Sequence, residues 1–382
     1  KCRRMPGGCG GKMAMRLWKA MQHNDDRHGP PPLPPPSDRC VLIPAYRPAF
    51  EDLARLVSTC QRLSLDMESV RLFAILSDGD EVSDFRQQYP QQSAALTFLA
   101  LDGLLHRHVH ANVTISGLMR QHNSRCWEPR RTMSAIKKFV GMDALHRRGC
   151  TYGWVLDSES MPLRKFTFSS IFNEFEANPR VLATNMSHRL VKPDSRHTKL
   201  MRCAARGLGL ARDVAHHTHR TVDWWVWSLK DVVDLMAHVR SNHRQPFLHG
   251  FVSYPAGDSI YYGLYVQHIV PHSASARSPV KHTIVSIPEA LIESGLAPKF
   301  RINVELSTEI WKCHDHHSPW TPREKQLILS GPLQWARGWR FDDLRCKNKN
   351  TSYATKLLKV SPSVTWATSN FRDQVELPYD RA

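Results

Sequence analysis

Two carboxylates follow an apolar segment in the middle of the chain. Residues 152–157 read YGWVLD, and the triplet Asp157, Ser158 and Glu159 stands at the end of this segment. Residues two apart in a strand face the same side, so Asp157 and Glu159 would share a crevice if the strand continues through Ser158. Two hard oxygen ligands suit Mg²⁺ or Mn²⁺, which takes its other ligands from water and phosphate. The triplet therefore predicts a divalent cation site, with capping of the following helix by Asp157 or Ser160 as the alternative.

The segments before the triplet alternate between two patterns. Short apolar runs, typical of buried strands, occupy residues 40–46, 70–80, 96–101 and 152–157. Apolar residues at helical spacing lie between these runs, over 48–63, 80–90 and 132–149. After the triplet, 161–179 is predicted to be a helix and 181–187 a strand. This alternation is typical of an α/β sheet with crossover helices, whose ligands bind outside the carboxyl ends of the strands.

The first part of the chain has a different composition from the rest. Residues 29–38 read GPPPLPPPSD, a stretch that favours polyproline conformation, and residues 1–38 are therefore expected to be a disordered Pro-rich stalk or tail. The whole chain is 41% hydrophobic, and most of its eleven tryptophans lie after residue 38. This remaining part can therefore form a sizeable core. The sequence opens with Lys and has no run of about 18 apolar residues, so we expect a missing native N-terminus and with it a possible missing membrane anchor.

The formal net charge of +17 favours acidic partners such as nucleic acid, anionic membranes, sulfated or phosphorylated substrates and nucleotide diphosphates. Lys and Arg are scattered along the sequence and no nucleic-acid-binding module is recognisable, so we expect no nucleic-acid partner. Nine cysteines without a CxxC pair argue against a zinc ribbon. Three sequons, at Asn112, Asn185 and Asn350, permit passage through the secretory pathway. The expected location is the Golgi or secretory lumen, with the cytoplasm as the alternative.

Three segments in order carry a resemblance to a known family. They are VLIPAYRP at 41–48, FAILSDGDE at 73–81, and the helix and strand of 134–160 that lead into Asp157-Ser158-Glu159. In this order they resemble a GT-A-type glycosyltransferase that uses a nucleotide-sugar donor, with the triplet as a variant of the family's metal-holding DxD motif. The resemblance covers about residues 40–188, and Glu159 departs from the usual second Asp.

The resemblance implies a fold and an activity. The fold would be α/β, a GT-A-like (Rossmann-like) mixed sheet flanked by helices, with an irregular acceptor-side region near the C-terminus. Residues 39–188 would bind the nucleotide sugar, and 189–382 would bind the acceptor within the same domain. The activity would be metal-dependent transfer of a hexosyl or pentosyl group from a nucleotide diphosphate sugar, a UDP-sugar in the first instance, to a hydroxyl of a glycan or glycoprotein. The cofactor would be Mn²⁺ or Mg²⁺.

By resemblance, donor-binding residues follow the first two strands and lie on the helix before the triplet. Asp78 would accept a hydrogen bond from the base, although S-D-G-D is also ordinary turn chemistry. Tyr46 could stack on the base and Arg47 could contact phosphate. Either Lys137 or Lys138 could reach the diphosphate while the other faces solvent, and Arg130 and Arg131 are weaker candidates for this role.

Candidate acceptor-side residues come later in the chain. An inverting transferase needs a carboxylate base, for which Asp258 is the first choice and Glu305 and Asp223 the second. Capping of the helix that follows is the alternative role of Asp258. His316, in the segment Cys313–His317, could be a further metal ligand. The aromatic cluster of Trp224, Trp225 and Trp227 could be a platform for a sugar or plain core.

Two other classes of function remain open from the sequence. A metal-dependent hydrolase or nuclease could use the cluster His314–His317, although its spacing fits no zinc pattern. A non-enzymatic basic binding protein would also account for the net charge.

Overall fold

The structure is a computed structural model of the chain. It describes residues 38–158, 160–162, 165–177, 179–184, 196–211, 220–221, 226–272, 283–287, 338–341 and 366–369. All of these belong to one compact unit, Ser37–Ala382. Nearly all of the predicted stalk, residues 1–37, lies outside the described residues. In the described part of the chain, no helix combines the length and apolar character needed to cross a bilayer.

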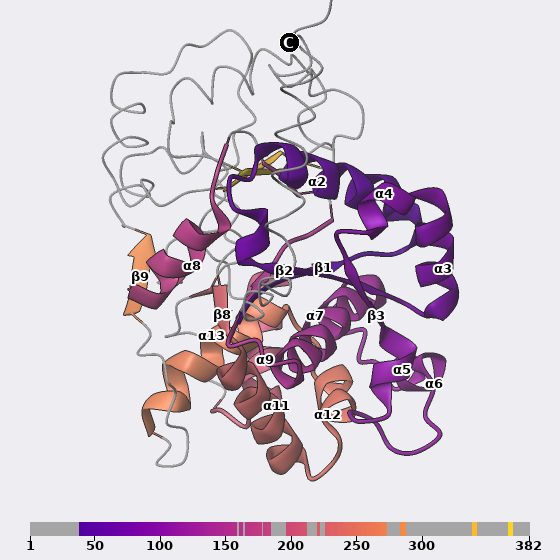
Figure 1. Cartoon of the computed structure of the whole chain (residues 1–382). Coiled ribbons are helices and arrows are strands. Elements are labelled where there is room, and N and C mark those ends of the chain that lie inside the picture. Colours follow the sequence, from indigo (N-terminus) through magenta and orange to yellow (C-terminus); the bar gives the residue numbers. More distant parts are fainter. Residues whose placement is uncertain are drawn as a thin grey trace, which may run out of the picture. The chain divides into compact units, whose positions relative to one another are not determined.

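The centre of the unit is a five-stranded mixed sheet (Figure 1). Its strand order is β3-β2-β1-β4-β8, from Thr97–Ala100, Arg71–Leu76, Arg39–Pro44, Tyr152–Val155 and Val226–Ser228. The first four strands run parallel and β8 is antiparallel to β4. The mixed α/β sheet flanked by helices that the sequence predicts is therefore confirmed. Because β1 lies between β2 and β4, the strand order reverses beside β1, where such sheets bind ligands.

Helices cover both faces of this sheet (Figure 1). They include α2 (Phe50–Leu63), α3 (Gly79–Gln88), α4 (Pro90–Ser93), α5 (Leu101–Leu105), α6 (Ile115–Arg120) and α7 (Pro129–Arg147). Val41 and Ile43 pack with residues of α2, whereas Leu42 packs with residues of α7, as the alternation of a strand requires. Gly141 of α7 allows the closest approach, since a Cβ at this position would lie 2.7 Å from a methyl carbon of Leu42.

A second group of helices packs on the outer side of α7. These are α9 (Arg196–Gly207), α11 (Leu229–His243), α12 (Phe247–Ser253) and α13 (Asp258–His268). The Phe139 ring of α7 lies 5.3 Å from Phe247, 5.5 Å from Phe251 and 6.3 Å from Tyr261, measured between ring centroids. The helix that precedes β4 is thus buried between the sheet and these helices, which fixes the side chains along its length.

Two small sheets and one helix complete the described elements. One sheet pairs β10 (Gly338–Phe341), β11 (Trp366–Ser369) and β5 (Ser160–Pro162), and the other β7 (Arg220–Thr221), β6 (Arg180–Thr184) and β9 (Thr283–Ile287). The helix predicted over 161–179 is shorter, because Ser160–Pro162 pairs antiparallel with Trp366–Ser369. The helix α8 occupies Phe168–Ala177. The three-residue 3-10 helices are Arg47–Ala49, Met67–Ser69 and Val270–His272.

Two disulfides lie among the described residues. Cys40 bonds to Cys150, joining the start of β1 to the turn before β4, and Cys126 bonds to Cys203 of α9. Cys60 is a free thiol in the core. Its burial raises the pKa of the thiol far above the ordinary value. The remaining cysteines lie outside the described residues.

Candidate functional site

A cavity of about 620 Å³ opens at the carboxyl ends of β1, β2 and β4. Its lining brings together six segments of the chain: the end of β1 and the residues after it, the residue after β2, the first half of α7 with the two residues before it, the residues after β4, Leu200 of α9 and the start of α13. The lining residues that matter for chemistry are Tyr46, Ser77, Arg130, Arg131, Lys137, Lys138, Asp157 and Asp258. Tyr46, Lys137, Lys138, Asp157 and Asp258, all predicted from the sequence, therefore share one cavity.

The backbone turns immediately after β4. The strand ends at Val155, and the Ser160 N–H donates to the Asp157 carbonyl at 2.9 Å, which closes a turn over residues 157–160. The extended conformation on which a shared crevice for Asp157 and Glu159 depends therefore ends before Ser158, and Ser160 leaves the main sheet to begin β5. Asp157 nevertheless lines the cavity, with 28% of its side chain exposed. Glu159 lies outside the described residues.

The Lys138 ammonium lies between two carboxylates. Its Nζ is 3.2 Å from Asp157 Oδ1 and 3.7 Å from Asp258 Oδ2. Only 10% of the Lys138 side chain and 9% of the Asp258 side chain are exposed. Attraction between such poorly solvated charges is stronger than in water, so this group ties β4, α7 and α13 together at the cavity.

Asp258 begins α13 at the cavity wall. The N-cap is Gly257, and Asp258 is the first helical residue, so the alternative role of Asp258 as the N-cap is wrong. The first turn of α13, from Asp258 to Ile260, lines the cavity. The N–H groups of a helix's first turn lack partners within the helix and attract anions. The cavity therefore combines a carboxylate with a surface suited to negative charge.

Lys137 occupies the other end of the cavity. Its Nζ donates to the Ala45 carbonyl at 2.6 Å and to Ser77 Oγ at 3.0 Å, joining the ends of β1 and β2. Burial lowers the pKa of Lys137 to about 8, against the attraction of Glu81 and Asp78, which raises it. The expectation that one of the two lysines faces solvent is wrong. The helix α7 is covered on both sides, and as whole residues Lys137 and Lys138 are only 6% and 8% exposed.

Tyr46 and Arg130 form a second contact at this end. The Arg130 guanidinium carbon lies 5.4 Å from the Tyr46 ring centroid, and Arg130 also donates to the Tyr46 hydroxyl. This cation–π contact holds the ring at the cavity edge. Arg131 lines the cavity too and pairs with Glu128 at 3.4 Å.

Two other predicted donor residues do not line the cavity. The Asp78 carboxylate caps α3 by accepting from the Glu81 N–H at 2.8 Å. Glu81 in turn accepts from the backbone N–H groups of Ser77 and Arg47. Arg47 pairs with Asp84 through its side chain. Turn and cap chemistry thus accounts for both residues, and their roles toward a donor stay predictions.

Several predicted residues lie outside the described residues. They are Glu159, Asp223, Trp224, Trp225, Glu305, His316 and the rest of the His314–His317 cluster. The third aromatic residue, Trp227 of β8, is described and buried, with its ring 4.3 Å from that of Tyr262. Trp227 therefore belongs to the core and not to a sugar platform.

Asp157 offers carboxylate oxygens, the kind of ligand that a hard divalent cation takes. Two carboxylates already hold a cationic group between them, the ammonium of Lys138. In the described part of the chain, no three His, Cys, Asp or Glu side chains converge to enclose a metal ion. A divalent ion at Asp157 would therefore have to take most of its ligands from water and phosphate, as Mg²⁺ and Mn²⁺ do.

The comparisons with known proteins give matches only among solved structures. No family model and no curated protein matches the sequence. The mannosyltransferase Ktr4p from S. cerevisiae is 11% identical over 60% of this chain and 65% of that chain, with a TM-score of 0.39. Core-mannan synthase A from Aspergillus fumigatus, in its Mn/GDP form, is 9% identical over 62% and 71%, with a TM-score of 0.40.

The galactosyltransferase LgtC, in complex with donor and acceptor sugar analogs, is 8% identical over 56% of this chain and 70% of that chain, with a TM-score of 0.30. These proteins are glycosyltransferases, the class that the sequence resembles. The matched part spans less than two thirds of the yeast protein. Likenesses at these TM-scores assign no activity to this chain, so its function has to come from its own residues.

Some cavity residues were not singled out from the sequence. Ser77 directly follows β2, as Ala45 directly follows β1. This position at the carboxyl end of a strand could have identified Ser77 as a cavity residue. Trp127 and Leu200 carry no such signal, because a disulfide between neighbouring residues brings their segments together across 77 positions.

Proposed function

We propose that this chain is a metal-dependent glycosyltransferase that moves a hexosyl or pentosyl group from a nucleotide diphosphate sugar to a hydroxyl of a glycan or glycoprotein. The observation that carries the proposal is the Lys138 ammonium held between Asp157 and Asp258 in a cavity at the carboxyl edge of parallel strands. Ligands of open α/β sheets bind outside this edge, and 620 Å³ lies within the usual volume of ligand pockets.

The donor would lie along the cavity from Tyr46 to Asp157. The Tyr46 ring offers a surface for the base, uracil in the first instance. Lys137 and Lys138 would attract the diphosphate through their ammonium groups, and the N-terminus of α13 would add the positive end of its helix dipole. The two ends of the cavity would therefore bind the two ends of the nucleotide.

The cation would be held by Asp157, with Glu159 and His316 as further ligands proposed from the sequence. A bound Mn²⁺ or Mg²⁺ would neutralise the negative charge of the diphosphate as it leaves. Lys138, beside Asp157, would add positive charge at the same place.

Asp258 would act as the base of an inverting reaction. Its carboxylate would take the proton of the acceptor hydroxyl while the acceptor oxygen bonds to the anomeric carbon. The bond between that carbon and the diphosphate oxygen would break in the same step, and the electron pair would stay on the diphosphate. Lys138 holds the Asp258 carboxylate in the cavity, ready for this transfer.

The two disulfides support a place for the protein in the secretory pathway. Disulfides form and persist in oxidising compartments and are rare in the cytosol. Cys40–Cys150 joins the start of β1 to the turn before its neighbour β4, and Cys126–Cys203 joins the segments that bring Trp127 and Leu200 to the cavity. We therefore propose the Golgi or secretory lumen as its location.

A donor panel tests the proposal. Purified protein is incubated with UDP-, GDP- and CMP-sugars and mixed glycan acceptors, with and without Mn²⁺, and products are followed by mass spectrometry. The proposal predicts one donor consumed only with Mn²⁺, and loss of this turnover in Asp157→Asn. A folded protein that consumes none of the donors would rule the activity out.

A further inference from the structure

Positive charge is concentrated on one side of the cavity. Four residues, Arg125, Lys199, Arg202 and Arg206, form what we call the basic rim. The helix α9 carries three of them and has no acidic residue, and between residues 120 and 131 Glu128 is the one acidic residue of the sequence. By contrast, α3 on the other side of β1 carries Asp80, Glu81 and Asp84. The net charge of +17 is therefore unevenly distributed among the described elements.

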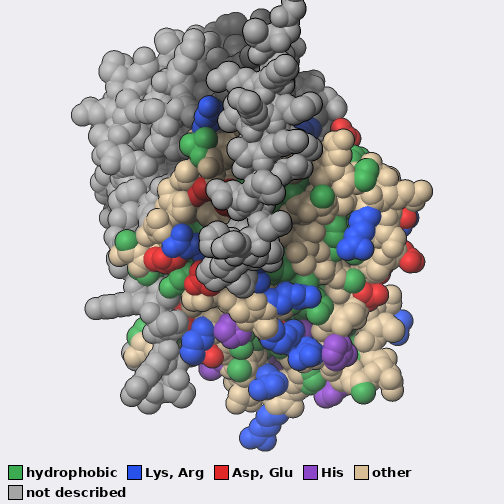
Figure 2. All heavy atoms as spheres, in the orientation of Figure 1, with side chains coloured by type: hydrophobic (Ala, Val, Ile, Leu, Met, Phe, Trp, Pro, Cys, Tyr) green, Lys and Arg blue, Asp and Glu red, His purple; other side chains and the backbone are tan. Residues whose placement is uncertain are grey.

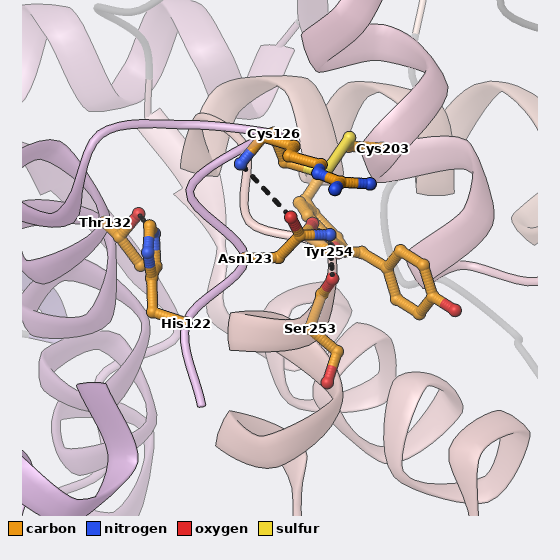
Figure 3. The surroundings of a disulfide bond; sticks show 9 residues. His122, Asn123, Cys126, Thr132, Cys203, Ser253 and Tyr254 are labelled. Carbon is orange, nitrogen blue, oxygen red and sulfur yellow. Dashed lines mark hydrogen bonds between the residues drawn. A yellow bond between two sulfur atoms is a disulfide. The ribbon is translucent and has the colours of Figure 1, made fainter. Parts of the chain in front are cut away.

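The Cys126–Cys203 disulfide (Figure 3) joins the two segments that carry these residues. Arg125 directly precedes Cys126, and Arg202 directly precedes Cys203. The Cα atoms of the two cysteines lie 5.9 Å apart. Trp127 and Leu200, one and three residues from the two half-cystines, line the cavity. The basic rim therefore borders the cavity wall, although Arg125 is more than 70 positions from the three residues of α9 in the sequence.

The loop that carries Arg125 is held in place by Asn123. The Asn123 N–H donates to the Val252 carbonyl at 2.9 Å, and its amide donates to the Ser253 carbonyl at 3.1 Å (Figure 3). The Asn123 side-chain oxygen accepts from the Arg125 N–H at 3.1 Å. Arg125 therefore lies on a loop that is held in place by the hydrogen bonds of Asn123 and by the Cys126–Cys203 disulfide.

The three residues on α9 share a face. Lys199, Arg202 and Arg206 follow one another at three and four residues, the spacing of neighbours on a helix surface. Lys199 and Arg206 are exposed and Arg202 is half-buried. Figure 2 shows Lys and Arg side chains, with His among them, gathered on the part of the visible face where α9, α11 and α12 lie. The surface beside the cavity is therefore cationic over several elements.

The chemistry of the rim favours a soluble polyanion. Membrane-binding surfaces combine basic residues with inserted apolar ones, and Leu65 of the turn after α2 is the one exposed large hydrophobic residue in the described ranges. Three of the four rim residues are Arg, whose planar fork pairs with sulfate and phosphate through two parallel hydrogen bonds. Lys137 and Lys138 are the residues proposed for the donor diphosphate, so the rim would serve a second ligand.

We infer that the basic rim binds an anionic glycan with sulfate or phosphate ester groups, and that this glycan is the acceptor. This inference deepens the proposed function, since it names the acceptor class. A glycan seated on Arg125 and α9 extends to the cavity wall at Trp127 and Leu200, which brings one of its hydroxyls toward Asp258. Its charges pair with the rim while its neutral hydroxyl enters the cavity.

Binding without donor tests the inference apart from the enzyme assignment. The probe is a heparin-derived sulfated oligosaccharide, compared with neutral dextran and with poly-glutamate and polyuridylate of matched charge, by calorimetry at several salt concentrations. The test variant is Arg125→Ser with Lys199→Ser. The matched control is Arg62→Ser with Lys165→Ser, which removes one exposed Arg and one exposed Lys on the α2 side of the sheet.

We expect the sulfated oligosaccharide to bind more tightly than the other probes, with an affinity that falls as salt is added. The rim variant should weaken this binding roughly fivefold while the control stays within twofold. No binding, equal effects of the two variants, or tighter binding of poly-glutamate or polyuridylate would overturn the inference. If the oligosaccharide binds at the rim but no nucleotide sugar is consumed, the proposed function fails and the rim remains a glycan site.

Discussion

The two ends of the cavity treat the same residue type in different ways. At one end, Lys137 donates to a carbonyl and a hydroxyl, and burial lowers its pKa to about 8. At the other end, the next residue, Lys138, lies between Asp157 and Asp258. The ends of β1 and β2 present neutral oxygens, whereas the exit of β4 and the start of α13 present carboxylates. The neighbouring elements, and not the lysines themselves, therefore distinguish an end where the ammonium meets neutral oxygens from a carboxylate end, where it meets Asp157 and Asp258.

The largest expected effect on turnover comes from the carboxylate end, where Lys138 lies between Asp157 and Asp258. Asp258→Asn keeps the shape of the side chain but removes the base, so kcat should fall by about 10²- to 10⁴-fold while the donor Kd changes little. Initial rates with the donor found in the panel measure this. Asp234→Asn, which removes an ion-paired carboxylate from α11, is the matched control and should keep normal turnover. A kcat within tenfold of the unmodified protein would exclude Asp258 as the base.

Removing Lys138 should destabilise the fold. Lys138→Met leaves two carboxylates facing each other without their cation, at an expected cost of about 2–4 kcal/mol in the free energy of unfolding. The expected cost is below that of a fully buried pair, because 28% of the Asp157 side chain is exposed. Urea denaturation measures it. Adding Asp258→Asn to this variant should recover at least half of the loss, and no recovery would mean that the two groups are not coupled.

Lys137 should make donor binding sensitive to pH. With a pKa of about 8, Lys137 is charged at pH 7 and mostly neutral at pH 9, so its attraction for the diphosphate should weaken over this range. We expect the donor Kd to rise several-fold from pH 7 to pH 9 in calorimetry. Lys137→Met should bind about tenfold more weakly at pH 7 and change little on going to pH 9. Parallel pH profiles for the two proteins would contradict this role.

The smallest expected effect is at the cavity edge. Tyr46→Ala removes the stacking surface and should weaken donor binding about fivefold, near 1 kcal/mol, whereas Tyr46→Phe should stay within about threefold. Fluorescence titration with the nucleotide alone is sufficient. If the Phe variant loses as much as the Ala variant, the contact that matters is the hydroxyl bonded to Arg130 and not the ring.

The sequence predicted the part of the site that follows from periodicity. Parallel strands end at one edge of their sheet, so residues after β1 and β4 converge, as Tyr46 and Asp157 do. The long helix before β4 packs along one face of the sheet with its first half at that edge, which places Lys137 and Lys138 in the cavity. Local chemistry was harder to rank, since Asp78 satisfies both a base-binding and a capping pattern and the structure uses the cap.

The remaining features depend on contacts between distant residues. The turn after Asp157 exists because Ser160–Pro162 pairs with Trp366–Ser369, about 200 positions away. The basic rim depends on a disulfide between Cys126 and Cys203, and cysteine positions alone do not fix the pairing. Charges that are scattered along the sequence were therefore not predicted to gather beside the cavity.

The central claim is that a cation at Asp157 and the lysines beside it bind a nucleotide diphosphate. Thermal unfolding in the presence of UDP-, GDP- and CMP-sugars, with and without Mn²⁺, tests this most directly, because a ligand that binds the folded state raises its melting temperature. We predict that one nucleotide class raises the melting temperature by a few degrees only when Mn²⁺ is present, and that Asp157→Asn abolishes the rise. No rise with any nucleotide, or an equal rise in Asp157→Asn, would contradict the claim.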